Sequence, residues 1–285
     1  MKIAIIGGNG QLGSDIDAVF SSTHEVVSLN HSDIDIINVG QVKEILSAIK
    51  PDVVINTAAA HNVPNCEQDS AHAFLVNGIG TLNLATMSNV LNYALVHYST
   101  DYVFDGIKKR PYFEDDATNP LNVYAITKRA GENFVLNYSK QGYIIRISGI
   151  YGKVPCRAKG GNFITTMLRL ANEKPEVKVV GNEILTPTST YDIAINTKLL
   201  IEERPSQGIY HMTNEGECSW YEFAKEIFSI MKINTPLFET TVNQESIPIK
   251  RPFYSVLENA ALKKNNLNVM PHWKVSLKSF LTSNV

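Results

Sequence analysis

The sequence predicts an α/β fold, a doubly wound parallel sheet of the Rossmann type followed by a smaller C-terminal lobe that binds substrate. Three observations predict it. Short apolar runs alternate with segments of helical period, the runs are apolar on both faces, and a glycine-rich segment follows the first run. Strands that are apolar on both faces are typical of a parallel sheet covered by helices on each side.

Two kinds of segment alternate up to about residue 150. Apolar runs predict strands at 3–6, 25–29, 53–56, 95–99 and 143–147. Segments of helical period predict helices at 10–20, 42–49, 71–91 and 121–138. The second helix is expected to stop before Pro51, because a proline disfavours helix at the residue before it. We therefore place a dinucleotide-binding domain at 1–150, completed by part of 185–215.

The rhythm changes after Gly149. A loop rich in Gly, Lys and Arg is expected at 152–161, and its Arg157 and Lys159 are weak candidates for phosphate contacts. Ser219 is a plausible N-cap of an amphipathic helix, and the tail from 235 to 285 looks irregular. We predict a smaller substrate-binding lobe at 151–285, with helices at 162–171, 191–200 and 219–231 and strands at 177–180 and 209–212.

The composition excludes several classes of protein. The 285 residues are 44% hydrophobic and 19% charged, with a net charge of -2 and no long run of one sign, so neither nucleic acid nor a membrane surface is an expected partner. No apolar stretch reaches the roughly 18 residues that a membrane-spanning helix needs. The three cysteines are far apart, which fits a reducing compartment. We expect a cytoplasmic protein.

Tyr124 and Lys128 stand four residues apart in a predicted helix, so both side chains project from one helix face. A phenol ordinarily holds its proton until about pH 10, and a neighbouring ammonium group lowers that pKa by favouring the phenolate. The pair therefore predicts an acid/base that works near neutral pH. The structural alternative is a half-buried Tyr beside a solvated Lys.

A glycine-rich segment joins the first predicted strand to the first predicted helix. Gly7, Gly10 and Gly13 are spaced three apart, with Gln11 and Leu12 between the last two. Glycine permits a positive φ and lets the backbone approach a pyrophosphate closely. The N–H groups of the helix N-terminus then attract the negative charge. The segment predicts a dinucleotide-binding site, with a purely structural turn as the alternative.

The residues after the second predicted strand do not decide between NADPH and NADH. An acid there would bind the adenine ribose and repel a 2′-phosphate, but this chain has Asn30 followed by His31. We expect Asn30, Asp35 and Ile36 to border the adenine. A solvated turn residue is an equally good interpretation of Asp35.

Ligands of a doubly wound sheet lie beyond the carboxyl ends of its strands. Thr100 closes the strand before the helix of Tyr124, so we expect its hydroxyl in the same crevice, within reach of a carbonyl oxygen or of the phenol. Ala58 and Ala59 follow the third strand and would line the cofactor with small side chains. Thr100, Tyr124 and Lys128 thus form a candidate catalytic set on a nucleotide-binding scaffold.

Further segments repeat the pattern of one family over nearly the whole chain. They are residues 10–13, 98–106, 120–124 with 127–128, 161–163 with 166–168, 187–188, 208–211, and 251–252 with 255. The sequence resembles the extended short-chain dehydrogenase/reductases, and within them the dTDP-4-dehydrorhamnose reductases. The Ser-Thr-Asp-Tyr-Val-Phe run at 99–104 is fairly specific to this branch.

The resemblance implies a function for the candidate set. Thr100, Tyr124 and Lys128 would be the catalytic triad of an NAD(P)H-dependent oxidoreductase. The enzyme would reduce the 4-keto group of a nucleotide-linked 6-deoxysugar in dTDP-rhamnose and polysaccharide biosynthesis. The nucleotide sugar would bind in the second lobe.

The resemblance also implies further ligands. Asn77 would join the active-site network beside the cofactor, unless it is a surface residue. Asp101 and Tyr102 would face the sugar, with a buried structural role as the competitor for Tyr102. Asn162 would bind a diphosphate or cap a helix. Arg251 would pair with a substrate phosphate or be solvated.

Two segments depart from the family pattern. The family has Ala-Ala-Tyr-Thr-x-Val-Asp after the third strand, whereas residues 58–64 of this chain lack that Tyr, Thr and Asp. The family commonly has Trp in an Arg-Thr-Ser-Trp segment, where residues 146–149 end in glycine. Both segments lie near the sugar pocket in the family, so the sequence supports the cofactor chemistry better than the sugar. We expect no metal and leave a homodimer open.

Two other classes remain as alternatives. A nucleotide-sugar epimerase or dehydratase would use the same Tyr and Lys but hold its NAD tightly. A dehydratase normally adds a second acid after the catalytic Thr, and here Asp101 is followed by Tyr102. A relative of the family is a non-catalytic, NADP-binding regulatory subunit of methionine adenosyltransferase, a role that the intact triad disfavours.

Overall fold

Six parallel strands form the central sheet, in the order β10-β5-β4-β3-β1-β2. The computed structural model describes residues 1–156, 160–243 and 245–283, so Arg157 and Lys159 lie outside the described residues. The strands are β1 (Lys2–Ile6), β2 (Glu25–Leu29), β3 (Val53–Asn56), β4 (Ala94–Thr100), β5 (Gly142–Ile147) and β10 (Gly208–His211). The predicted parallel sheet is confirmed.

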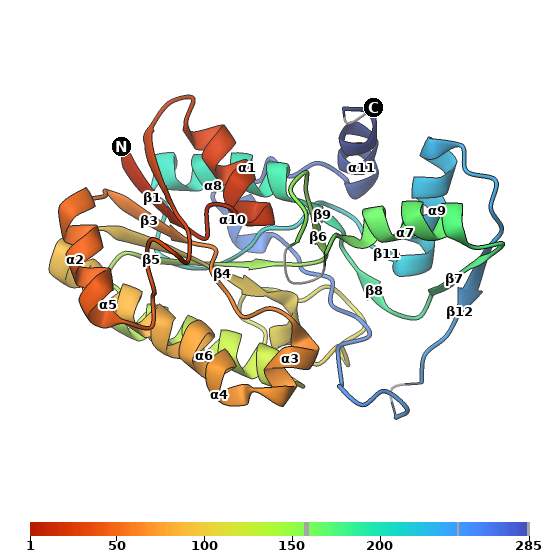
Figure 1. The fold of residues 1–285 in the computed structure, drawn as a ribbon, viewed down its shortest axis with the longest axis horizontal. Helices are drawn as coiled ribbons and strands as arrows, with labels where there is room; N and C mark the ends of the chain where they lie inside the picture. Colours follow the sequence, from red (N-terminus) through yellow and green to blue (C-terminus); the bar gives the residue numbers. More distant parts are fainter. Residues whose placement is uncertain (157–159, 244, 284–285) are drawn as a thin grey trace.

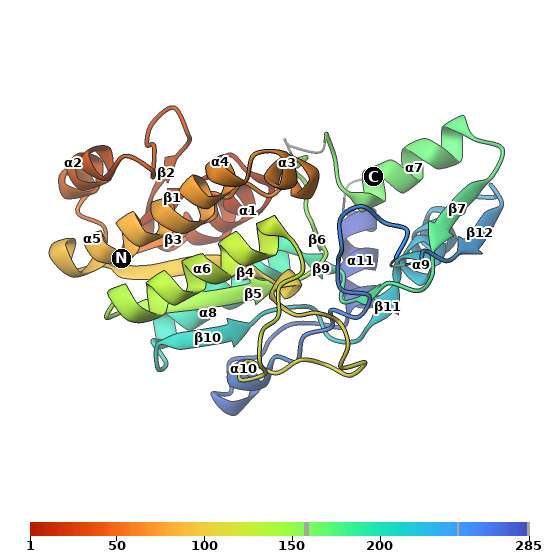
Figure 2. The same ribbon diagram turned by 90° about the horizontal axis from the view of Figure 1, so that it is seen from below.

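Helices cover both faces of this sheet, as Figures 1 and 2 show. The helices α1 (Gln11–Phe20) and α8 (Thr190–Glu203) pack together on one face. The helices α2 (Val39–Ile49), α5 (Thr81–Leu91) and α6 (Val123–Tyr138) lie on the other. Such double winding requires strands that bury alternate side chains in two separate cores.

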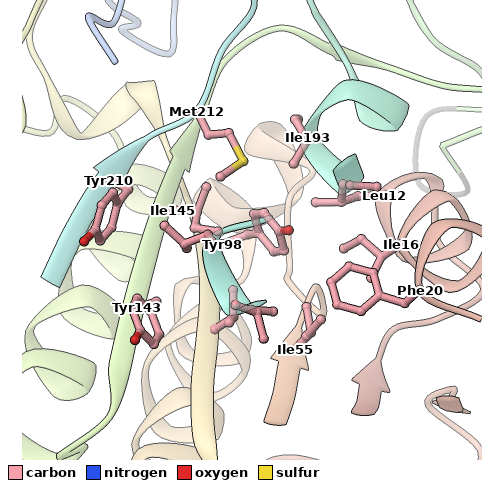
Figure 3. Packing of buried hydrophobic residues seen from close by; sticks show 14 of the residues in the cluster. Leu12, Ile16, Phe20, Ile55, Tyr98, Tyr143, Ile145, Ile193, Tyr210 and Met212 are labelled. Atoms are coloured by element: carbon pink, nitrogen blue, oxygen red, sulfur yellow. The ribbon is translucent and has the colours of Figure 1, made fainter. Parts of the chain in front are cut away.

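The first strand shows this alternation directly. Ile3 and Ile5 join the core beneath α1 and α8, which Figure 3 shows from close by. Ala4 and Ile6 join the core beneath α2 and α5. All four side chains are at most 2% exposed, so a strand of five residues helps to hold both layers.

The strand order reverses at β1. Its neighbours are β2 on one side and β3 on the other, and all the pairings are parallel. The connections that leave β1 and β3 at their carboxyl ends therefore run in opposite directions and leave a crevice between them. This is the edge at which the sequence places the glycine-rich segment and the residues from Ala58 onward.

The predicted helix 71–91 is confirmed over its length, although it is not one regular α-helix. The chain instead forms α4 (Ser70–Phe74), a π-helical turn η1 (Leu75–Gly80) and then α5. Asn77 lies in the π turn with its side chain buried, where its Oδ1 accepts from the Ala60 N–H at 2.9 Å and its Nδ2 donates to Thr127 Oγ1 at 3.0 Å. Single π turns are frequent at functional sites, and this one holds the segment after β3 against α6.

A second, smaller core lies beside the sheet. It is built on α7 (Phe163–Glu173), β7 (Val177–Val180), α9 (Trp220–Met231), β12 (Leu237–Thr240) and α11 (Trp273–Thr282). The Ser219 cap is confirmed, because its hydroxyl accepts from the Glu222 N–H at 3.0 Å while the Glu222 carboxylate accepts from the Ser219 N–H at 2.8 Å. The remaining elements are α3 (Val63–Gln68), η2 (Asp101–Val103), β6 (Ile150–Tyr151), β8 (Ile184–Leu185), β9 (Thr188–Ser189), β11 (Cys218–Ser219) and α10 (Ala260–Lys264).

The expectation of an irregular tail is wrong for part of 235–285. The strand β12 pairs with β7, and α11 packs into the second core. Trp273, Leu277 and Leu281 recur every four residues and are all buried, which is a helical signal that the sequence carries. The division of domains near residue 150 stays a prediction, and α8 and β10 return to the first sheet after it.

Over the described residues, no helix is long and apolar enough to span a membrane. Within the same residues, no group of three or more His, Cys, Asp or Glu side chains is arranged to hold a metal ion.

A buried ion pair joins α6 to the sheet. Arg146 of β5 donates from Nε and Nη2 to the two carboxylate oxygens of Glu132, both at 2.8 Å. The two side chains are 1% and 0% exposed. Arg129, which is 27% exposed, adds a third contact at 3.2 Å.

Removing the buried partner should leave an uncompensated charge in the core. We predict that Arg146→Met lowers the free energy of unfolding by about 3 kcal/mol or more, measured by urea denaturation. The control is Arg169→Gln, whose ion pair with Glu173 on α7 is exposed and should contribute less than about 1 kcal/mol. Equal losses in the two variants would contradict this account of how α6 is held.

Candidate active site

The glycine-rich loop packs so closely that side chains are excluded from it. Gly7 has a φ of +81°, and a Cβ there would lie 2.7 Å from Thr57 Oγ1 and 3.1 Å from the Ala58 nitrogen. A Cβ on Gly13 would lie 2.3 Å from the carbonyl oxygen of Gly7. The start of α1 therefore lies directly against the turn that follows β1, within the crevice between β1 and β3.

The residues of this loop fit a dinucleotide. Gln11 is buried, and its Nε2 has no hydrogen-bond partner among the described residues. Gly10 is the N-cap of α1 and offers no side chain to the first-turn N–H groups, which also lack an acidic neighbour in that turn. A buried donor without a partner and an uncapped helix N-terminus are features that a bound pyrophosphate would satisfy.

The residues expected at the adenine have local roles in the structure. The Asn30 N–H donates to Asp33 Oδ2 at 2.7 Å, and Asp35 Oδ1 accepts from the Ile37 N–H at 3.0 Å. Ile36 is buried in the core beneath α2. These contacts shape the turn after β2, and a contact of Asn30, Asp35 or Ile36 with adenine stays a prediction.

The catalytic candidates meet at the carboxyl end of β4. Thr100 is the last residue of β4, and Tyr124 is the second residue of α6. The Thr100 hydroxyl donates to Asp101 Oδ1 at 3.0 Å, accepts from the Tyr102 N–H at 3.2 Å and is hydrogen-bonded to the phenol of Tyr124. Lys128 follows one turn later, 3% exposed, with its Nζ 3.3 Å from His97 Nε2. The structure thus places Thr100 against Tyr124 and places Lys128 one helix turn further on, against His97, and the catalytic roles of the three residues stay a prediction.

The predicted lowering of the Tyr124 pKa is wrong for this structure. Burial raises the pKa of Tyr124 above its ordinary value, and the hydrogen bond with Thr100 only partly offsets this. Burial also lowers the pKa of Lys128 to about 8, against the charge of Glu132, which raises it. Desolvation disfavours the charged form of each group, so the phenol keeps its proton while the ammonium holds its proton less firmly.

Asp101 lies directly behind Thr100. It is 4% exposed and accepts hydrogen bonds from the hydroxyls of Thr100, Ser148 and Ser255, at 3.0 Å from Thr100 and 2.7 Å from Ser148. Burial raises the pKa of Asp101, and the three hydroxyls lower it. The carboxylate fixes the direction of the Thr100 hydroxyl, and a contact of Asp101 with a sugar stays a prediction.

A charged and aromatic cluster lies beside the phenol. The ring of Tyr102 meets that of Tyr124 edge to face, with centroids 6.2 Å apart. Burial raises the pKa values of both Tyr102 and Glu183, and the charge of Arg251 lowers both. Glu183 is also hydrogen-bonded by Trp220. Glu183 and Trp220 carry no local sequence signal, because Glu183 lies just before β8 and Trp220 lies at the start of α9, far along the chain.

Asn122 connects this cluster to the catalytic helix. Its side-chain oxygen caps α6 by accepting from the Ala125 N–H at 2.9 Å. Its Nδ2 donates to the carbonyl of Lys250 at 2.9 Å. The segment that contains Arg251 is therefore tied to the helix turn that contains Tyr124.

Asn162 has the capping role that the sequence offered as one alternative. It is the N-cap of α7, where its Oδ1 accepts from the Thr165 N–H at 3.0 Å. Its Nδ2 donates to the carbonyl of Gly152 at 3.2 Å. Both ends of the amide are engaged, and a contact with a diphosphate stays a prediction.

The segment that departs from the family pattern folds back over the start of the crevice. His61 Nδ1 lies 3.2 Å from the carbonyl oxygen of Ala59, and its Nε2 lies 3.1 Å from Cys156 Sγ. Cys66 donates to the carbonyl of Ala60 at 3.4 Å. The sequence marked this segment as different but did not pair His61 with Cys156, because the two lie in separate loops.

This chain has a parallel Rossmann sheet with a glycine-rich first turn, and Thr, Tyr and Lys lie where β4 and α6 meet. Together these features define an extended short-chain dehydrogenase/reductase. Comparison with known families narrows this class. The model of the RmlD substrate binding domain matches residues 1–285, and the chain belongs to this family.

Named relatives are similar to this chain over nearly its full length. A spore coat polysaccharide biosynthesis protein, SpsK, from Bacillus subtilis (strain 168) is 36% identical over 98% of this chain and 96% of its own. The crystal structure of a dTDP-4-dehydrorhamnose reductase from Clostridium acetobutylicum ATCC 824 is 40% identical, with a TM-score of 0.94 over 100% of this chain and 99% of that one. The dTDP-4-dehydrorhamnose reductase from Bacillus anthracis str. Ames, in complex with NADP, is 34% identical, with a TM-score of 0.93 over 99% of each chain.

The tight packing of the glycine loop can be tested directly. A methyl group at Gly13 must displace the Gly7 carbonyl, and overpacking of this kind costs about 1–3 kcal/mol. We predict that Gly13→Ala weakens NADPH binding about tenfold or more, measured by fluorescence titration. Gly40→Ala, whose methyl group would lie 3.2 Å from the Asn38 side chain that caps α2, away from the glycine loop, should leave the affinity unchanged. Unchanged affinity in Gly13→Ala would place the cofactor elsewhere.

Proposed function

We propose that this protein is an NAD(P)H-dependent reductase of the 4-keto group of a nucleotide-linked 6-deoxysugar, with dTDP-4-dehydrorhamnose as its substrate. The observation that carries the proposal is the hydrogen bond of Thr100 with Tyr124 at the edge of the sheet where the glycine loop opens, with Lys128 one helix turn further along α6. The names of two similar proteins, both dTDP-4-dehydrorhamnose reductases, support the choice of substrate.

The acid in this reaction is the Tyr124 phenol. A nicotinamide bound at the glycine loop would supply hydride to the ketone carbon, and negative charge would then develop on the ketone oxygen. Because burial raises the pKa of Tyr124, the phenol is protonated at neutral pH and ready to donate. Thr100 is hydrogen-bonded to the phenol, and its single proton, which is donated to Asp101 in this structure, would turn to the ketone oxygen when substrate binds.

Lys128 restores the acid after the transfer. Its pKa of about 8 lies nearer to neutrality than that of an ordinary lysine, so it gives up a proton more readily. The ammonium lies one helix turn from the phenol and stabilises the phenolate left behind by the transfer. We also assign to Lys128 a hydrogen bond to the nicotinamide ribose, as the family resemblance implies.

Arg251 is the proposed ligand of the substrate diphosphate. Its charge acts on Tyr102 and Glu183, and Asn122 ties its segment to the start of α6. A guanidinium group forms strong, charge-assisted hydrogen bonds with phosphate oxygens. Tyr102, which touches Tyr124 edge to face, would then line the sugar between the diphosphate and the reacting ketone.

If Tyr124 is the general acid, removal of its hydroxyl should slow the reaction. Tyr124→Phe should lower kcat about 10²–10⁴-fold, because general acid catalysis contributes that much, while NADPH binding stays near the wild-type value. The assay follows NADPH absorbance with dTDP-4-dehydro-6-deoxy-L-mannose. Tyr138→Phe, at a 51% exposed position of the same helix, is the matched control and should be fully active. If Tyr124→Phe keeps more than about a tenth of wild-type kcat, Tyr124 is not the essential acid.

The assigned phosphate ligand predicts a separate effect. Arg251→Gln should raise the KM for the nucleotide sugar about tenfold or more, since a hydrogen bond to a charged group contributes about 1.5–3 kcal/mol. The Kd for NADPH should not change. Arg169→Gln removes a cation that is paired with Glu173 on the surface of α7 and serves as the control. A change in NADPH affinity with no change in KM would assign Arg251 to the cofactor instead.

The same assays separate the alternative functions. An epimerase or dehydratase would be purified with its nicotinamide cofactor bound and would not consume added NADPH. A regulatory subunit would bind NADPH, oxidise none of it with any 4-keto sugar nucleotide and co-purify with a synthetase. A cytoplasmic location and the choice between monomer and homodimer remain inferences from the sequence.

A further inference from the structure

A chain of buried polar groups leads from the crevice to Lys128. Asn56 is the last residue of β3 and His97 lies in β4, and they are 1% and 0% exposed. Asn56 Oδ1 accepts from the Ala58 N–H at 3.2 Å, and Asn56 Nδ2 lies 3.1 Å from His97 Nδ1. His97 Nε2 lies 3.3 Å from Lys128 Nζ. The chain joins the backbone that follows β3 to the catalytic lysine.

The first group in this chain fixes the direction of the others. A backbone N–H can only donate, so the Asn56 atom that faces Ala58 must be its oxygen. The Asn56 NH₂ group then donates to His97 Nδ1, which must be an unprotonated acceptor. A neutral imidazole has one proton, so that proton is on Nε2 and points at Lys128.

The direction of this chain conflicts with a charged lysine. An ammonium group has three donors and no lone pair, so it cannot accept from the Nε2–H of His97. An ammonium that donates to Nε2 would move the imidazole proton to Nδ1, where it would face the Asn56 NH₂ group. Either arrangement leaves two donors facing each other in a buried site, which is unfavourable.

We propose that the Ala58–Asn56–His97 hydrogen-bond chain disfavours the ammonium form of Lys128 in the cofactor-free protein, which makes His97 a positioning residue for the catalytic lysine. The effect of the Lys128 protonation state on turnover rests on the proposed function, whereas the protonation state itself does not. Gly131 of α6 allows the close approach, since a Cβ there would lie 3.2 Å from His97 Nε2.

The other groups around Lys128 are consistent with this assignment. Glu132, next to Gly131 on α6, favours the ammonium, but its carboxylate is paired with Arg146 of β5 and with Arg129. Burial is the largest influence on Lys128 and lowers its pKa to about 8. Burial is the largest influence on His97 and holds its pKa well below the usual range, and an ammonium at Lys128 would lower that pKa further, so the imidazole stays neutral in either state of Lys128.

The proposal predicts the protonation of two side chains in the cofactor-free enzyme. With ¹⁵N-labelled histidine, His97 should show the Nε2–H tautomer by NMR. With ¹³C-labelled lysine, one Cε signal should titrate about two pH units below the ordinary lysine value of about 10.4. Lys128→Met should remove that signal and so assign it.

An isosteric substitution at Asn56 should reverse the direction of the hydrogen bonds between residue 56, His97 and Lys128. In Asn56→Asp, the carboxylate can accept from both the Ala58 N–H and His97 Nδ1–H, which leaves Nε2 free to accept from an ammonium. We expect the His97 proton to move to Nδ1 and the Lys128 midpoint to rise by about one pH unit or more. A His97 proton on Nδ1 would show that the hydrogen bonds have reversed. A negative charge at position 56 that acts on Lys128 only by electrostatic attraction would raise the midpoint without moving that proton.

Two results would overturn the proposal in the wild-type protein alone, whether or not the variant folds. One is the Nδ1–H tautomer of His97, and the other is a Lys128 signal that titrates with the remaining lysines. Neither measurement needs turnover, so an enzyme that shows both expected signals but fails to reduce the keto sugar would refute only the proposed function.

Discussion

The close approach of α6 to β4 is the constraint on which the rest of the site depends. A Cβ on Gly131 would lie 2.6 Å from the carbonyl oxygen of Asn77 and 3.2 Å from His97 Nε2, so a side chain there would push the helix away from both η1 and β4. The helix that comes this close carries Tyr124 to Thr100 and Lys128 to His97. The buried pair of Glu132 and Arg146 anchors the same helix to β5. The catalytic geometry is therefore a property of helix packing.

Burial sets the chemistry of this geometry. It raises the pKa of Tyr124 and lowers that of Lys128, because desolvation penalises the phenolate and the ammonium alike. A phenol that keeps its proton suits a reaction that must protonate a developing alkoxide. The direction of the Asn56–His97 chain acts in the same sense as burial on Lys128, and it does so through hydrogen-bond geometry.

Local patterns in the sequence were sufficient for the sheet and the triad, but not for contacts between distant segments. The strands at 25–29 and 53–56 match the predicted bounds, and each contains a pair of adjacent valines that favour a strand. The local pattern does not predict the π turn in 71–91, and Asn77 within that turn contacts Ala60, 17 positions earlier. Asn56 and His97 are 41 positions apart, and His97 and Lys128 are 31 apart, so no local motif reports their chain. The sequence left the cap and ligand roles of Asn162 open, and only the contacts with Thr165 and Gly152 show how the amide is used.

The central claim is that this site moves a hydride to a ketone carbon while Tyr124 protonates its oxygen. The most direct measurement uses NADPH that carries two deuterium atoms at the nicotinamide C4 position, with dTDP-4-dehydro-6-deoxy-L-mannose as substrate and analysis of the product by mass spectrometry and proton NMR. The account predicts one deuterium per sugar, bonded to C4, and one NADPH consumed per product. A product without deuterium, or with deuterium at another carbon, would contradict it.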